Sequence, residues 1–224
     1  MTEPGGGRSP RILILDYGMG NLRSVEKALE RVGATAVIGA EPRLADEADG
    51  LVLPGVGAFP AAIERIRRQG IDELLAERRS AGVPILGICL GLQLLFSSST
   101  ELGGASGLGL LDGEVTELRA SGLKVPHIGW SRVRWEHPSR LSEGIADETP
   151  FYFVHSFAPR PGAGEALGTA EYGERFVCAA EHGEVFGVQF HPEKSSSAGL
   201  RLLANFAGIC AGVGAPEGSA PTRA

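Results

Sequence analysis

The chain has 224 residues, of which 43% are hydrophobic, and this is enough to bury a substantial core. Its formal net charge is −6, from 27 acidic and 21 basic residues, which argues against a nucleic-acid partner. Residues 1–10 are polar and glycine-rich, unlike a secretory signal, and the most apolar stretch, residues 51–63, is too short for a membrane span and is interrupted by Pro54 and Pro60. We therefore expect a soluble, cytoplasmic protein without a membrane partner.

The cysteines give no sign of a disulfide framework. Cys89, Cys178 and Cys210 form no Cys-x-x-Cys pair. An odd number of cysteines without regular spacing fits a reducing compartment, and it does not match a thiolate metal site. We predict neither a metal nor a cofactor.

The first predicted elements are a buried strand over residues 11–16 and a helix with Asn21 as its N-cap. The helix is indicated by an apolar stripe of Leu22, Val25, Leu29 and Val32. The intervening turn, Gly18-Met19-Gly20, contains two glycines of the dinucleotide-binding pattern, but the third would fall on Arg23. We therefore interpret the turn as a tight connection that requires glycine dihedral angles.

The first half of the chain alternates between strand and helix. Strands are expected at residues 36–38 and 50–53, helices at 60–68 and 71–81, and a further apolar strand stops at Gly87. This alternation predicts a parallel, doubly wound sheet. The strand over residues 50–53 leads directly into a glycine-rich loop, at the sheet edge where such folds bind ligands.

The second half has a different pattern. Short strands separated by glycine and proline are expected at residues 110–118, 131–135, 151–157 and 176–181, and a last helix at 198–209 would be capped by Ser195 or Ser196. The predicted fold class is therefore α/β, with a doubly wound, mostly parallel open sheet and antiparallel additions in the second half. We expect one domain over residues 11–210, with disordered tails at 1–10 and 211–224.

Cys89 lies at the centre of the most informative segment. In Gly87-Ile88-Cys89-Leu90-Gly91 the cysteine stands between an apolar strand and a helical apolar pattern. This is the thiol version of the nucleophile elbow, in which small flanking residues permit a strained turn that exposes the nucleophile. A buried structural cysteine is the alternative, and the pattern needs a partner to exclude it.

The candidate partner lies in Gln189-Phe190-His191-Pro192-Glu193. Pro192 keeps His191 extended, and residues i and i+2 of an extended chain point to the same side. His191 and Glu193 therefore face the same way. A carboxylate beside an imidazole can fix its tautomer and leave Nε2 free for a nucleophile, as in a catalytic triad.

Residues 87–93 and 190–193 resemble the two signatures of the triad-type (class I) glutamine amidotransferases. Residues 16–25, 53–59 and 126–130 resemble the glutaminase subunits of imidazole glycerol phosphate synthase, of histidine biosynthesis. The resemblance extends from about Arg11 to Cys210 in the expected order. Several separately placed motifs are more specific than any one of them.

The resemblance implies roles for individual residues. Cys89, His191 and Glu193 would form the catalytic triad, and backbone N–H groups at Val56 and Leu90, beside Gly57, would stabilise an oxyanion. Gly55 and Gln93 would contact the glutamine substrate. An interface and ammonia exit would be formed by Gly18, Met19, Gly20, Asn21, Trp130, Tyr152 and Lys194.

The resemblance also implies a flavodoxin-like fold and a divided reaction. This chain would hydrolyse L-glutamine to glutamate and ammonia, as a hydrolase. Nothing in it resembles an acceptor site for a phosphorylated sugar nucleotide. Ammonia would therefore pass to a (β/α)8-barrel cyclase subunit, in a heterodimer whose lyase reaction makes imidazole glycerol phosphate and aminoimidazole carboxamide ribotide.

Three alternatives are considered. A glutaminase of another pathway, such as pyridoxal phosphate or anthranilate formation, is disfavoured by residues 17–21. A non-catalytic binding module of the same fold would be expected to lack a triad residue, and a hydrolase acting alone would need no partner. The sequence assigns no role to His127, His137, His155, His182, Cys178 or Cys210.

Overall fold

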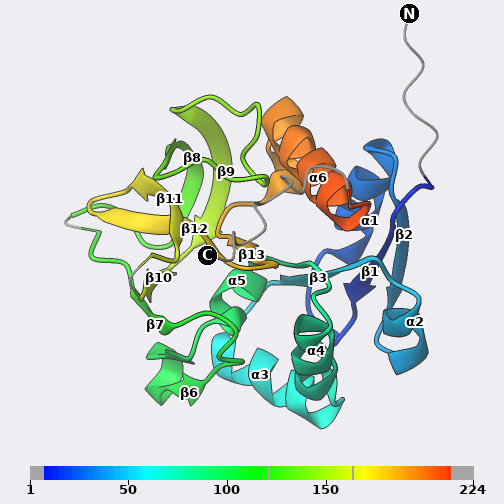
Figure 1. Ribbon diagram of the computed structural model, residues 1–224. Helices are drawn as coiled ribbons and strands as arrows, with labels where there is room; N and C mark the ends of the chain where they lie inside the picture. Colours follow the sequence, from blue (N-terminus) through cyan, green and yellow to red (C-terminus); the bar gives the residue numbers. More distant parts are fainter. Residues whose placement is uncertain (1–7, 121, 163, 213–224) are drawn as a thin grey trace, which may run out of the picture.

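In the computed structural model, which describes residues 8–120, 122–162 and 164–212, the chain is built around one long twisted sheet (Figure 1). The strand order is β2-β1-β3-β4-β13-β12-β11-β8-β9. Neighbouring strands from β2 to β13 pair in parallel, and those from β13 to β9 pair antiparallel. The predicted α/β fold, with a parallel sheet and antiparallel additions, is confirmed.

The parallel part of the sheet is buried on both faces. β3, β4 and β13 are buried along their whole length, as expected for apolar strands covered by helices. In β1, Ile12 and Ile14 join one core cluster, while Leu13 and Leu15 join the other. The strands of this part are β1 (Arg11–Leu15), β2 (Thr35–Gly39), β3 (Gly50–Gly55), β4 (Ile85–Cys89) and β13 (Val185–Val188).

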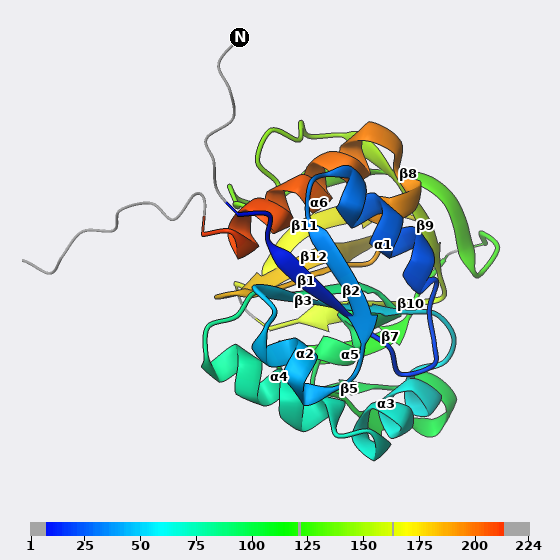
Figure 2. The same cartoon turned by 90° about the vertical axis from the view of Figure 1, so that its right-hand side faces the viewer.

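Helices cover both faces of the parallel part (Figure 2). α1 (Leu22–Arg31) and α6 (Ser196–Cys210) pack against each other over one face. The other face carries α3 (Phe59–Arg68), α4 (Ile71–Ser80) and α5 (Leu90–Leu95), with the short α2 (Pro42–Asp46) beside α4. This two-sided arrangement leaves the carboxyl ends of β1, β3 and β4 together at one edge of the sheet.

The second half of the chain builds the antiparallel part and a smaller second sheet. β8 (His127–Trp135), β9 (Thr149–His155), β11 (Ala166–Glu171) and β12 (Arg175–His182) extend the main sheet. The second sheet has the order β10-β7-β5-β6, and its strands are β5 (Ser98–Ser99), β6 (Ala105–Ser106), β7 (Gly113–Glu117) and β10 (Phe157–Pro161).

Some elements differ from the predicted ones. The strands β5, β6 and β11 and the short helix α2 were not predicted, because they are short or show no clear alternation, and the strand predicted at residues 110–118 is β7 of the second sheet. The strand predicted at residues 151–157 is broken at Ser156, where the chain leaves β9 of the main sheet and enters β10 of the second. At this break, Nδ1 of His155 forms a hydrogen bond with the carbonyl oxygen of Phe157.

The residues predicted as helix N-caps stand at the expected positions, but their side chains do not form the capping hydrogen bonds. Asn21 and Ser195 precede α1 and α6, yet neither side chain makes a capping hydrogen bond. The Ser195 hydroxyl donates instead to the carbonyl of His191 at 2.7 Å and accepts from the Tyr152 N–H at 3.0 Å. It therefore ties β9 to the segment that carries His191. Of the predicted tails, residues 1–7 and 213–224 lie outside the described residues.

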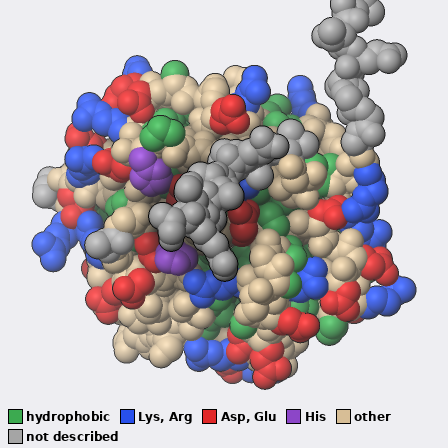
Figure 3. All heavy atoms as spheres, viewed as in Figure 1, with side chains coloured by type: hydrophobic (Ala, Val, Ile, Leu, Met, Phe, Trp, Pro, Cys, Tyr) green, Lys and Arg blue, Asp and Glu red, His purple; other side chains and the backbone are tan. Residues whose placement is uncertain are grey.

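The surface agrees with the mixed charge of the sequence. On the face drawn in Figure 3, acidic and basic side chains are interspersed. No helix in the described part of the chain is long and apolar enough to cross a membrane.

Two helical glycines should respond oppositely to an added methyl group. A Cβ on Gly91 would lie 1.7 Å from the Leu53 carbonyl oxygen, whereas a Cβ on Gly208 would meet nothing within 4 Å. We expect Gly91→Ala to lower the free energy of unfolding by at least about 1–3 kcal/mol through overpacking, and Gly208→Ala to raise it by about 0.5–1 kcal/mol. Denaturant unfolding measures both, and equal losses would contradict the packing at the β4–α5 corner.

Candidate active site

Cys89 occupies a sharp corner between β4 and α5. Its backbone angles, φ 55° and ψ −110°, are strained for a residue with a side chain. Glycines on either side make the corner possible, since a Cβ on Gly87 would lie 2.7 Å from the Leu92 nitrogen and one on Gly91 would overlap Leu53. The side chain is thereby presented at the edge of the sheet, as the elbow pattern predicts.

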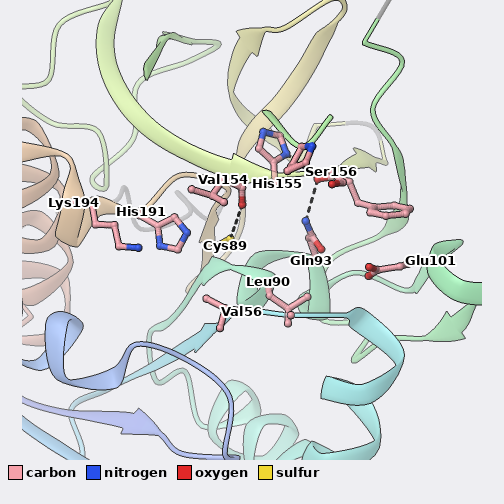
Figure 4. Close-up of a pocket in the computed structure, with 13 residues that line it drawn as sticks. Val56, Cys89, Leu90, Gln93, Glu101, Val154, His155, Ser156, His191 and Lys194 are labelled. Atoms are coloured by element: carbon pink, nitrogen blue, oxygen red, sulfur yellow. Dashed lines mark hydrogen bonds between the residues drawn. The ribbon is translucent and has the colours of Figure 1, made fainter. Parts of the chain in front are cut away.

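The thiol faces a cavity of about 280 Å³ at the carboxyl ends of the parallel strands (Figure 4). Such an edge is where open α/β sheets bind ligands. The walls come from the loop after β3, the end of β4 with the start of α5, the start of η1 (Glu101–Gly103) and the segment before β8. The β9–β10 connection and the segment before α6 complete them. The lining residues are Val56, Gly57, Cys89, Leu90, Gln93, Glu101, Pro126, Val154, His155, Ser156, Phe157, His191 and Lys194.

His191 lies just after β13 and just before the short helix η2 (Pro192–Lys194). Its backbone is extended, as the following Pro192 favours. Its Nδ1 is 2.9 Å from Oε1 of Glu193, and the two side chains are only 5% and 1% exposed. The predicted pairing of His191 with Glu193 is therefore present, as a buried imidazole–carboxylate pair. The predicted extended chain ends at His191, however, and the turn into η2, not strand alternation, places Glu193 beside the ring.

Opposing effects act on the proton of His191. Burial lowers its pKa, but hydrogen bonds to Cys89 and Glu193, together with their negative charge, outweigh burial and raise the pKa to about 9. At neutral pH the ring is therefore protonated. Cys89, His191 and Glu193 thus form a hydrogen-bonded chain, in which the positive charge of the imidazolium ring lies close to the sulfur.

Gln189 is a neighbour of the thiol that the sequence analysis missed. Its side chain is fully buried, and its Nε2 reaches the Cys89 sulfur at 3.8 Å. The sulfur also lies 3.7 Å from the Val154 carbonyl. The signal for Gln189 was present, because it stands two residues before His191 on the same extended segment.

The predicted oxyanion residues lie around the sulfur. Val56 and Gly57 form the loop after β3, and Leu90 is the first residue of α5, where backbone N–H groups have no partner within the helix. Gly57 has φ 107°, and a Cβ there would lie 2.7 Å from Cε of Met19. The glycine therefore lets this loop pack directly on the loop after β1.

The two residues predicted to contact the substrate are placed differently. Gln93 lines the cavity, but its Nε2 already donates to the Phe157 carbonyl and to Oε1 of Gln189, both at 3.0 Å. Gly55 does not line this cavity. A Cβ on Gly55 would lie 2.2 Å from the Tyr17 hydroxyl, so the position needs glycine for packing, and a backbone contact with glutamine stays a prediction.

Glu101 is a second residue that the sequence analysis missed. It lines the cavity from η1, and its Oε2 accepts a hydrogen bond from the Phe59 N–H at 2.8 Å. Nothing in the local sequence marks it. Only the packing of η1 against α3 brings this carboxylate to the cavity.

The predicted interface residues lie on the rim of the cavity. Trp130 and Tyr152 are opposite each other on β8 and β9, with ring centroids 5.8 Å apart, and Lys194 lines the cavity itself. The loop of Gly18, Met19, Gly20 and Asn21 contacts the rim through Gly57. The large apolar side chains that are exposed among the described residues are Val56, Leu102, Leu123, Val125, Ile128 and Trp130. Val56 lines the cavity, and Leu102 and Val125 are next in the chain to the lining residues Glu101 and Pro126. Exposed apolar side chains beside a cavity are typical of a protein–protein contact.

Known proteins are similar to this chain in sequence. The model of the family "Glutamine amidotransferase class-I" matches residues 13–210. A protein of Moorella thermoacetica named imidazole glycerol phosphate synthase subunit HisH is 52% identical over 87% of this chain and 93% of its own length. Proteins of the same name from Leifsonia xyli and Methanosarcina barkeri are 47% and 46% identical, over 88% and 89% of this chain and 97% and 99% of theirs.

Solved structures agree in fold. The structure of PurLQS from Thermotoga maritima has a TM-score of 0.72 at 19% identity, over 90% of this chain and 99% of that one. A glutamine amidotransferase of the same organism has a TM-score of 0.63 at 16% identity, over 91% and 99%. From the family match and the close relatives together, the chain belongs to the class-I glutamine amidotransferases and, within them, to the group of HisH subunits of imidazole glycerol phosphate synthase.

Proposed function

We propose that this chain is the glutaminase subunit of an imidazole glycerol phosphate synthase of histidine biosynthesis. It hydrolyses L-glutamine to glutamate and ammonia. The observation that carries the proposal is the strained Cys89 beside the buried His191–Glu193 pair, at the wall of a cavity of about 280 Å³. The names of relatives that are 46–52% identical support the pathway.

The proposed reaction has two stages. The Cys89 thiolate attacks the side-chain carboxamide carbon of glutamine, and the protonated His191 gives its proton to the departing ammonia. This leaves a thioester and a neutral imidazole. His191 then takes a proton from water as the water oxygen attacks the thioester, and the C–S bond breaks to release the Cys89 thiolate beside the protonated His191. The new carboxyl group loses its proton to solvent, and the product leaves as glutamate. Glu193 holds the imidazole orientation throughout.

Backbone N–H groups stabilise the oxyanion of the tetrahedral intermediates by hydrogen bonding. We assign the oxyanion site to the loop at Val56 and Gly57 and to Leu90, because both border the sulfur at the cavity wall. In other acyl-transfer enzymes the loss of one such donor costs about 10²–10³ in turnover. The positive φ of Gly57 allows this loop to change peptide orientation at small cost.

The α-ammonium and α-carboxylate groups of glutamine each need a protein group of opposite charge or polarity. The Glu101 carboxylate suits the α-ammonium group, and its place in the cavity, on the same side as Gln93 in Figure 4, supports this role. Gln93 has its amide nitrogen in use, so only its carbonyl oxygen is free to contact the substrate. Gly55 is assigned to packing.

The ammonia is consumed by a partner in this proposal. The exposed apolar rim and the loop of residues 18–21 are the docking surface, with Trp130, Tyr152 and Lys194 beside the exit. The partner is a (β/α)8-barrel cyclase, joined to this chain in a cytoplasmic heterodimer. The lyase step that yields imidazole glycerol phosphate belongs to that cyclase, whereas residues 11–210 of this chain form one glutaminase domain.

The first test separates ammonia production from its use. Cys89→Ala should abolish glutamine-dependent synthesis by the complex, because no thioester can form, and it should leave synthesis from added ammonium salt nearly intact. Product formation is measured with both nitrogen sources. Cys210→Ala is the control and should retain both activities; loss of both in Cys89→Ala, with the complex assembled, would contradict the division of labour.

A glutamine-like electrophile should label one thiol. Burial raises the pKa of Cys178 well above its usual value and raises that of Cys210 to about 12, so neither forms a thiolate at neutral pH. Cys89, in contrast, has His191 as its partner and faces the cavity. Peptide mapping by mass spectrometry should find the label on Cys89, and comparable labelling of the three cysteines would remove the reason to call it activated.

The pH profile should report the proton on His191. With its pKa raised to about 9, the ring can protonate the leaving ammonia below that pH and cannot above it, so kcat should fall as pH rises through about 9. Glu193→Gln removes a group that raises this pKa, and the alkaline fall should move to lower pH. Glu77→Gln, on exposed α4 surface, is the control; an unmoved profile in Glu193→Gln would refute the assignment.

A further inference from the structure

Two histidines without an assigned role lie in the wall of the cavity and directly behind it. His127 on β8 and His155 on β9 are register partners in the antiparallel ladder. Both are buried, and Nδ1 of His127 lies 3.1 Å from Nε2 of His155. His155 lines the cavity, whereas His127 sits one strand further from it.

The neighbours of this pair fix which nitrogen carries each proton. The Phe157 carbonyl can only accept, so Nδ1 of His155, at 2.9 Å, is its donor and Nε2 of His155 is bare. Nδ1 of His127 must then donate to that nitrogen, which leaves Nε2 of His127 bare. The Ser131 hydroxyl, 3.1 Å from this Nε2, therefore donates to it. All the hydrogen bonds point from Ser131 towards Phe157.

Both rings stay neutral, as this arrangement requires. Burial lowers the pKa of His127 to about 4. Burial likewise lowers the pKa of His155 to about 3, against the hydrogen bond to Phe157, with further lowering from His127 and His191. The ring of His127 is also held in place by stacking on Tyr172 and Phe153, at centroid distances of 4.0 Å and 5.1 Å.

The same carbonyl connects the histidines to the thiol. The Phe157 oxygen accepts a second hydrogen bond, from Nε2 of Gln93, whose other N–H donates to Oε1 of Gln189. That bond fixes the Gln189 amide so that its NH2 group reaches the Cys89 sulfur. Hydrogen bonds therefore run without a gap from Ser131, on the strand that exposes Trp130, to the sulfur.

We propose that Ser131, His127 and His155 form a positioning relay that holds the Phe157 carbonyl, and through Gln93 and Gln189 the Cys89 sulfur, in reactive geometry. The inference rests on the proposed glutaminase function. His127 and His155 touch no reacting atom and are positioning residues. Because Ser131 is next to the rim residue Trp130, a shift of β8 on partner docking would be transmitted to the thiol.

A pair of substitutions at one position separates this role from simple packing. His127→Asn keeps an N–H donor near the place of Nδ1 but loses the stacked ring. His127→Phe keeps the ring and its stacking but leaves Nε2 of His155 without a donor. The relay predicts that the Phe variant loses kcat by about 10–10²-fold with little change in KM. It predicts that the Asn variant keeps kcat and melts at a lower temperature.

Packing alone predicts the reverse order. If the Phe variant of the complex turns over glutamine like the wild type while the Asn variant does not, the relay is overturned. The alkylation rate of Cys89 by iodoacetamide gives a readout that does not depend on the substrate, and it should fall in the Phe variant only. A wild-type complex without glutamine-dependent activity would instead refute the proposed function.

Two further measurements test the relay even if a His127 variant fails to fold. Ser131→Ala should lower kcat and Ser131→Thr, which keeps the hydroxyl, should restore it; equal activity in both would count against the relay. Long-range nitrogen–proton NMR of the full chain at neutral pH should find both His127 and His155 protonated at Nδ1 and bare at Nε2. An Nε2–H form of either ring would break the relay.

Discussion

The corner at Cys89 is the constraint on which the rest of the site depends. Its φ of 55° is tolerated because the neighbouring glycines permit close packing. Gly91 lets the start of α5 pack on Leu53, and Gly87 lets β4 pack on the backbone of Leu92. The corner fixes the sulfur above the sheet and brings the first N–H groups of α5 to the cavity. The strain is local, and the close packing of β3, β4 and α5 holds it in place.

The second half of the chain completes the site that the first half begins. β13 returns to pair with β4, which brings His191 and Gln189 beside Cys89 although they lie a hundred residues later in the sequence. Ser195 then ties the His191 segment to β9, so the wall formed by Val154 and His155 is held against the thiol. The second sheet adds Phe157, whose carbonyl receives two hydrogen bonds at once.

Three imidazoles near one cavity have different protonation for physical reasons that can be named. His191 is buried, yet the charges and hydrogen bonds of Cys89 and Glu193 raise its pKa to about 9. His155 and His127 are buried without a carboxylate partner, and their pKa values fall to about 3 and about 4. One ring can therefore exchange a proton with substrate, while the other two serve as fixed, neutral hydrogen-bonding groups.

The sequence by itself determined the local features of this protein. Periodicity and turn chemistry act over a few residues, so they were sufficient to predict the parallel strands and helices, the corner at Cys89 and the shared direction of His191 and Glu193. Tertiary structure alone decided the second sheet, the position of Glu101, the packing role of Gly55 and the contact between Gln93 and Gln189, which are 96 residues apart. A sequence pattern specifies which side of a strand is buried, but the group that lies opposite is set by long-range pairing and register.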